Sequence, residues 1–191
     1  MKLFSVAAVA AVAAFAFASE SLAQTPVAPG SVKIGKVQPS VVKTPEYQIV
    51  GGQNKRFKNR DWLEVEVEFA TTQEEIDELT FKFSILIEGK LLDGEATYVA
   101  IPKDREHYGV MYVAPRTLEK LTGGKTLTNA SIQNVWVTVS HSGQILGEAA
   151  FKQERQPNLP HITGAVLNKD QTPFAPLYFD RYETLKPTQN R

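Results

Sequence analysis

Residues 63–69 alternate strictly between apolar and acidic side chains, and this alternation limits the possible folds more than any other feature. Leu63, Val65 and Val67 share one face of an extended chain, and the three intervening glutamates share the other. A helix would scatter these residues around its circumference. The segment is therefore predicted to be a β-strand with one buried face and one solvated face.

The same period of two recurs along most of the chain. Phe81, Phe83, Ile85 and Ile87 repeat it, and Val135, Val137 and Val139 mark the inward face of a later strand. Further strands are predicted at residues 32–37, 47–50, 96–101, 107–113, 132–140 and 145–151. Turns between strands are predicted at Gly51-Gly52, Asp93-Gly94, residues 102–104, Gly123-Gly124 and Ser142-Gly143. Only residues 72–79 and 115–121 indicate helix.

Seven or eight short strands, each with one wet face, indicate an all-β fold. We expect an immunoglobulin-like antiparallel β-sandwich, with a jelly roll or a small closed barrel as the alternatives. The chain has no cysteine, so packing alone must stabilise it. Trp62 and Trp136 lie opposite the valines of their strands, where each either marks a contact surface or is covered by another segment of the chain.

The first 23 residues are typical of a secretory signal peptide. Lys2 precedes an apolar, alanine-rich run, and Ser21-Leu22-Ala23 provides small residues for cleavage after Ala23. A membrane anchor would need about 20 strongly apolar residues, and this run is shorter. The protein is therefore expected to be exported to the periplasm, the outer membrane or the cell surface. Any membrane association would be through the uncleaved signal segment alone.

The remaining chain divides into three predicted parts. Residues 24–31 form a Pro/Gly linker, residues 32–153 form the β-sandwich, and residues 154–191 form an irregular C-terminal extension rich in proline and aromatic residues. Because proline cannot donate to a β-ladder, the extension should contain no central strand.

Within this extension, residues 172–182 concentrate large apolar side chains. These are Phe174, Leu177, Tyr178, Phe179 and Tyr182. Leaving each of them in water would forgo about 1.5–3 kcal/mol. They are therefore expected to cover either the sandwich of the same chain or a binding partner, and they are the predicted partner-binding residues.

No catalytic motif, cofactor site or metal site is predicted. His107, His141 and His161 lie far apart, and no nucleophile elbow or phosphate-binding loop occurs. Glu64, Glu66 and Glu68 are expected to be a solvated, edge-protecting face rather than paired catalytic carboxylates.

Lys55, Arg56, Lys58 and Arg60 form a basic patch that would suit an acidic glycan or an acidic protein surface. The whole chain has 21 basic and 21 acidic residues, and removal of Lys2 and Glu20 with the signal keeps the net charge at zero. Nucleic acid is therefore not an expected partner.

Three segments carry a resemblance to a known family: residues 62–69, 105–116 (Arg-Glu-His-Tyr-Gly-Val-Met-Tyr-Val-Ala-Pro-Arg) and 172–182 (Thr-Pro-Phe-Ala-Pro-Leu-Tyr-Phe-Asp-Arg-Tyr). The chain resembles a small secreted family that accompanies a type IV pilus-like system in Verrucomicrobia such as Akkermansia. The resemblance implies an immunoglobulin-like sandwich with a structural or adhesive role and no enzymatic activity.

The expected function is therefore that of a non-catalytic interaction protein, an accessory component of a pilus-like assembly with envelope or pilus-assembly proteins as partners. The alternative is a carbohydrate-binding module, which would need Trp62, Trp136 or Tyr98 exposed as a platform for a glycan. A hydrolase with a site assembled from distant residues would need a concave pocket with a perturbed carboxylate or histidine.

Overall fold

A computed structural model describes residues 26–48, 50–52, 58–152 and 155–187. The predicted signal peptide, with its cleavage site after Ala23, lies outside the described residues, as do Ile49, Lys55, Arg56 and Phe57. In the described part of the chain, no helix is long and apolar enough to cross a membrane.

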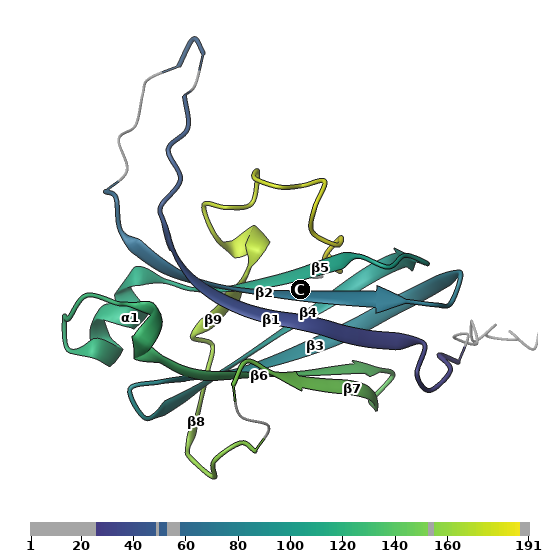
Figure 1. The fold of residues 1–191 in the computed structure, drawn as a ribbon. Helices are drawn as coiled ribbons and strands as arrows, with labels where there is room; N and C mark the ends of the chain where they lie inside the picture. Colours follow the sequence, from purple (N-terminus) through teal and green to yellow (C-terminus); the bar gives the residue numbers. More distant parts are fainter. Residues whose placement is uncertain (1–25, 49, 53–57, 153–154, 188–191) are drawn as a thin grey trace, which may run out of the picture.

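The described residues form two β-sheets packed face to face (Figure 1). The first sheet has the strand order β1 (Val32–Lys43), β2 (Asp61–Thr71), β5 (His107–Val113) and β9 (Val166–Asn168). The second has the order β7 (Gln144–Ala150), β6 (Ile132–His141), β3 (Glu75–Ile87), β4 (Lys90–Pro102) and β8 (His161–Thr163). Neighbouring strands are antiparallel except for the parallel pair β4 and β8.

This strand order confirms the predicted all-β sandwich. In the first sheet β2 lies between β1 and β5, and in the second β3 lies between β6 and β4. The two orders correspond to strands A-B-E and G-F-C-C′ of immunoglobulin-like domains. The helix α1 (Pro115–Thr122) and the short 3-10 helix η1 (Asn129–Ser131) connect β5 to β6.

The core lies between the inner faces of the two sheets, on the residues that the alternation predicted. Leu63, Val65, Val67 and Phe69 of β2 are buried, and so are the alternating residues of β3 and β6. Phe69 and Phe81 meet across the sandwich with ring centroids 4.8 Å apart. The helix at residues 115–121 is also confirmed, since Pro115 begins α1 and Gly123, at φ 63°, ends it.

The helix predicted at residues 72–79 was wrong, because β3 begins at Glu75. The spacing of Ile76 and Leu79 imitates a helical face, but both side chains are buried in the sandwich core. Pairing of residues 75–79 with β4 and burial of these two side chains outweigh a weak helical pattern. The strand pair is irregular here, since Ala100 of β4 has a φ of 53°.

The strand predicted at residues 47–50 is also wrong. Tyr47 and Gln48 lie in no strand, and Val50 is fully exposed in a turn. Instead, β1 extends to Lys43, and its pairing with β2 ends at Asp61. The Tyr47 hydroxyl donates a hydrogen bond to the backbone carbonyl of Pro173.

The predicted turn at Asp93-Gly94 lies inside β4, and the chain turns instead at Glu88 and Gly89, where φ is 48° and 69°. Gly94 is required for a different reason. A Cβ atom at this position would lie 2.5 Å from the Cβ of Val166, because β9 crosses directly over β4. The glycine therefore permits a close approach of two strands.

The C-terminal extension is part of both sheets and not a separate segment outside the sandwich. It adds β8 to the second sheet and β9 to the first, both as edge strands of three residues. At the other end of the described chain, residues 26–31 are not a free linker, since Val27 packs into the core.

We predict that Gly94→Ala lowers the free energy of unfolding by about 1–3 kcal/mol, because the added methyl group overpacks the contact with Val166. Gly147→Ala is the matched control. Its Cβ would meet Ile34 at an ordinary 3.5 Å, so its stability should change by less than about 0.5 kcal/mol. Denaturant unfolding measures both, and equal effects would contradict the role given to Gly94.

Candidate functional site

The outer face of the first sheet is covered by the C-terminal strap, defined as residues 169–187 (yellow in Figure 1). Trp62 of β2 and Val110 and Tyr112 of β5 form a second apolar cluster with Phe174 and Tyr182 of the strap. A face that the sequence predicted to be exposed to solvent is therefore largely covered.

Phe174 is the centre of this cluster. Its ring stacks on Tyr112, with centroids 4.6 Å apart and planes 4° apart, and meets Trp62 edge-on at 5.5 Å. The indole nitrogen of Trp62 donates to the Thr44 hydroxyl at 3.1 Å. Of the two alternatives for Trp62, the structure supports the covered one, because a segment of the same chain lies over the side chain.

Glu66 anchors the strap at its other end. The Arg181 guanidinium donates two hydrogen bonds to its carboxylate, at 3.0 and 2.9 Å, and the Tyr182 hydroxyl donates a third at 3.0 Å. Arg181 also lies over the ring of Tyr108, 3.7 Å from its centroid. A bidentate pair of this kind fixes orientation as well as adding energy.

Glu64 lies between these two anchors and accepts hydrogen bonds from Tyr112 at 2.9 Å and Ser40 at 3.4 Å. Partial burial raises the pKa of the Glu64 carboxyl above its ordinary value of 4.5, and the charge of Glu66 adds to the effect. Burial also raises the pKa of Tyr112 and of Tyr182 well above the ordinary tyrosine value, so both hydroxyls remain donors.

The expectation that these glutamates form a solvated, edge-protecting face was wrong. β2 is an interior strand of its sheet, the strap binds Glu66, and Glu64 hydrogen-bonds to Tyr112 and Ser40. The sequence contained a signal for this, since Arg181 and Tyr182 follow directly on the aromatic run. That these two residues bind Glu66 can be known only from the tertiary structure, which places the strap over β2.

The strap ends by joining the two sheets. Tyr182 makes a β-bridge with Tyr108 of β5, and Leu185 makes one with Tyr98 of β4. The backbone nitrogen of Lys186 donates to Thr97 at 2.7 Å, and its side chain pairs with Glu78.

Next to this junction lies a Thr–His–Glu arrangement that the sequence did not predict. His107 Nδ1 lies 2.7 Å from a Glu183 carboxylate oxygen, and its Nε2 lies 3.1 Å from the Thr71 hydroxyl. Although the order resembles a catalytic triad, Thr71 and His107 are each only 3% exposed. The Thr71 hydroxyl also contacts the Pro102 carbonyl at 2.7 Å and accepts from the Asp104 backbone nitrogen at 3.2 Å. A substrate therefore cannot reach Thr71 or His107, and the contact of His107 with Glu183 holds the strap against β5.

The three histidines lie on different strands, β5, β6 and β8. Among the described residues no cluster of metal-binding side chains occurs. His161 pairs with Asp93 at 2.6 Å on the surface of the second sheet, while the Nε2 of His141 is buried without a hydrogen-bond partner.

The five predicted contact residues divide into two groups. Phe174 and Tyr182 are buried against the sheet, and Leu177 is half-buried. In contrast, Tyr178 is 56% exposed and Phe179 is 81% exposed. Tyr178 has a left-handed φ of 53°, and its carbonyl accepts hydrogen bonds from Arg181 and Tyr182 at 3.1 and 3.3 Å. We call residues 177–180 the aromatic turn.

A pocket opens beside the aromatic turn. It is lined by Glu64, Glu66, Tyr178, Asp180, Arg181 and Tyr182. Glu66 and Tyr182 use their polar atoms in holding the strap.

The two other predicted surfaces are the basic patch and the glycan platform. In the basic patch, Lys55 and Arg56 are outside the described residues, Lys58 is exposed, and Arg60 lies 3.6 Å from Glu119. The glycan platform lacks its predicted exposure, since Trp62, Trp136 and Tyr98 are all buried. The Tyr98 hydroxyl instead bonds the backbone nitrogen and carbonyl of Val110, at 2.8 and 3.2 Å.

Comparisons with known proteins agree with this architecture. A protein-family model matches residues 23–189. A crystal structure of a protein from Akkermansia muciniphila is similar over 83% of this chain and 94% of that chain, with 22% sequence identity and a TM-score of 0.68. At this identity the likeness shows the fold alone. No curated protein matches the chain.

We predict that Phe174→Ala lowers the free energy of unfolding by about 3 kcal/mol, because it removes the ring that Trp62 and Tyr112 enclose. Phe179→Ala deletes the same side chain at an exposed position of the same strap and should change stability by less than about 0.5 kcal/mol. Denaturant titration followed by tryptophan fluorescence compares them. Similar losses would show that the strap is not held by Phe174.

We also predict that Glu64→Gln stabilises the protein at neutral pH. Because the folded-state pKa is raised, the folded protein binds a proton more tightly than the unfolded chain does, and stability falls as pH rises above 4.5. The advantage of the glutamine should therefore grow from near zero below pH 4.5 to a plateau above the raised pKa. Unfolding curves across this range measure it, with Glu75→Gln as an exposed control. A constant difference at all pH values would contradict the assignment.

Proposed function

The chain belongs to the protein family whose model matches residues 23–189, and we propose that it is a non-catalytic interaction protein of the cell envelope. As the resemblance implies, it serves as an exported accessory component of a type IV pilus-like assembly. Its partners are envelope or pilus-assembly proteins, in the periplasm, at the outer membrane or at the cell surface.

The aromatic turn is the observation that carries this proposal. Tyr178 and Phe179 are exposed at neighbouring positions, although burying a large apolar side chain gains about 1.5–3 kcal/mol. The residues before and after them are anchored, Phe174 in the second cluster and Arg181 on Glu66. Aromatic side chains held in this way lose little entropy on binding, and aromatic residues are enriched among the strongest contributors to protein interfaces.

The chemistry of the described residues supports the non-catalytic part of the proposal. Thr71 and His107 are buried, and each member of the Thr71–His107–Glu183 group has a role in holding the strap or the ends of the strands. The raised pKa of Glu64 follows from its partial burial, and its carboxylate hydrogen-bonds to Tyr112 and Ser40.

Photo-crosslinking in intact cells tests the proposal. With a photoreactive amino acid in place of the exposed Asp180, we expect crosslinks to pilus-assembly or other envelope proteins. Tyr178→Ser combined with Phe179→Ser should remove these crosslinks and lower thermal stability only slightly, because both side chains are exposed and only the edge-on contact of Tyr178 with Tyr182 is lost.

Ile162→Ser is the matched control, since it also removes an exposed apolar side chain but lies in β8, on the other sheet. It should leave the crosslinks intact. Retention of polysaccharide without any envelope protein would overturn the proposal and favour the carbohydrate-binding alternative. Crosslinks that survive the double substitution would exclude the aromatic turn as the contact.

A further inference from the structure

The edges of the two sheets are not equally protected against pairing with another strand. β8 and β9 are only three residues long. β1 carries exposed Lys33, Lys36 and Lys43, and its pairing is broken by a bulge between Ile34 and Val37. Short strands, lysines and bulges are the devices by which sheet proteins avoid unwanted edge pairing.

β7 lacks these devices. It is seven residues long, contains no proline or lysine, and pairs with β6 on one side as the end strand of its sheet. Its one charged residue is Glu148. Ile145 in the strand is 60% exposed, and Phe151 directly after it is 37% exposed. The strand is therefore a sheet edge with an apolar margin, and Ile34 of β1 lies close to it at Gly147.

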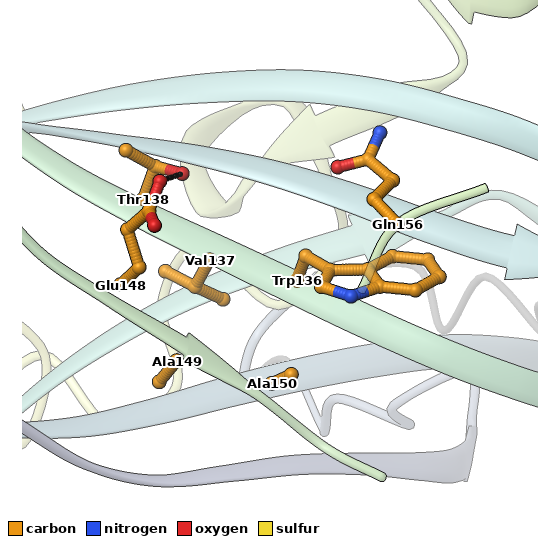
Figure 2. Close-up of a pocket in the computed structure, with 7 residues that line it drawn as sticks. All are labelled: Trp136, Val137, Thr138, Glu148, Ala149, Ala150 and Gln156. Carbon is orange, nitrogen blue, oxygen red and sulfur yellow. Dashed lines mark hydrogen bonds between the residues drawn. The ribbon is translucent and has the colours of Figure 1, made fainter. Parts of the chain in front are cut away.

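A pocket of about 510 Å³ lies on the outer face beside this edge (Figure 2). The indole of Trp136 and the side chain of Gln156 lie side by side at one end, and Thr138 and Glu148 lie together at the other. The small side chain of Ala150, which pairs with Trp136, completes it from β7. The pocket can take one large side chain from a strand added next to β7.

Glu148 indicates what kind of strand this would be. In a two-fold dimer, two copies of β7 would pair antiparallel. If the two strands overlap along their whole length, the pairing is centred near Gly147, and the two Glu148 carboxylates lie opposite or diagonal to each other. Like charges at this distance repel, so a second copy is disfavoured. A lysine or arginine opposite Glu148 would instead be attracted to it.

We propose that β7 is an acceptor edge for an extended segment of a partner protein. The segment adds as a sixth strand to the second sheet, with a basic residue opposite Glu148 and a large apolar residue two positions away in the Trp136 pocket. The proposal rests on the interaction function proposed above, but it uses a surface separate from the aromatic turn, so the two can fail independently.

A synthetic peptide of alternating threonine and valine, with a central lysine and a phenylalanine two positions from it, provides the probe. We expect it to bind and to slow amide hydrogen exchange in β7 but not in β1. The same peptide with proline at alternate positions should not bind, because it lacks the backbone donors. Binding of the proline peptide, or protection away from β7, would overturn the proposal.

Charge reversal supplies the second test. Glu148→Lys should weaken binding of the lysine peptide about two- to fivefold and strengthen binding of a matched glutamate peptide, since exposed cross-strand charge pairs contribute modestly. Glu75→Lys, an exposed reversal in β3, should change neither. Equal responses of the two variants would overturn the proposal.

Analytical sedimentation of the free protein tests whether a second copy of the chain, and not a partner segment, covers the β7 edge. Self-association that slows exchange in β7 would mean that a second copy covers the edge, and the proposal would be wrong. The variant with Tyr178→Ser and Phe179→Ser should bind the peptide normally even where its crosslinks in cells are lost. That pattern separates failure of the aromatic turn from failure of the β7 edge.

Discussion

The stacking of Phe174 on Tyr112 determines the path of the C-terminal strap, and much of the surface depends on that path. Tyr112 belongs to β5 and contacts Glu64 of β2, so the ring of Phe174 packs onto a sheet that is already fixed by its inner face. Once Phe174 is seated, Trp62 is covered and the Arg181–Glu66 pair can form at the other end of the strap. β2 is thereby covered on both faces.

The strap also connects parts of the fold that the sandwich core does not. Its bridges to Tyr108 and Tyr98 link β5 of the first sheet to β4 of the second, along the side where β9 crosses closely over Gly94. The pair of the buried His107 and the partly exposed Glu183 lies at this junction. Because Phe174 holds the strap before the aromatic turn and these contacts hold it after the turn, the turn is presented in a defined position. An interaction surface is thus built from a segment that also stabilises the fold.

Membership of the matched family and the likeness to the Akkermansia muciniphila structure support the same sandwich, but they name no partner. The two surfaces that we propose differ in physical character. The aromatic turn offers large side chains over the first sheet, and the β7 edge offers backbone hydrogen-bonding groups beside a pocket on the second. A protein with both could contact two components of an assembly at once.

The inner faces of the strands could be predicted from the sequence, because an apolar residue at every second position is visible in the order of residues without knowledge of the partner strand. Leu63, Phe83 and Val137 were therefore placed correctly, and so was the helix that begins at Pro115. Only the tertiary structure decided what lies on the outer faces. Glu66 looks solvated until Arg181, 115 residues later, is brought to it, and Gly94 looks like a turn until β9 crosses over it. Such contacts join residues far apart in the chain, and alternation along one strand carries no information about which distant segment will cover it.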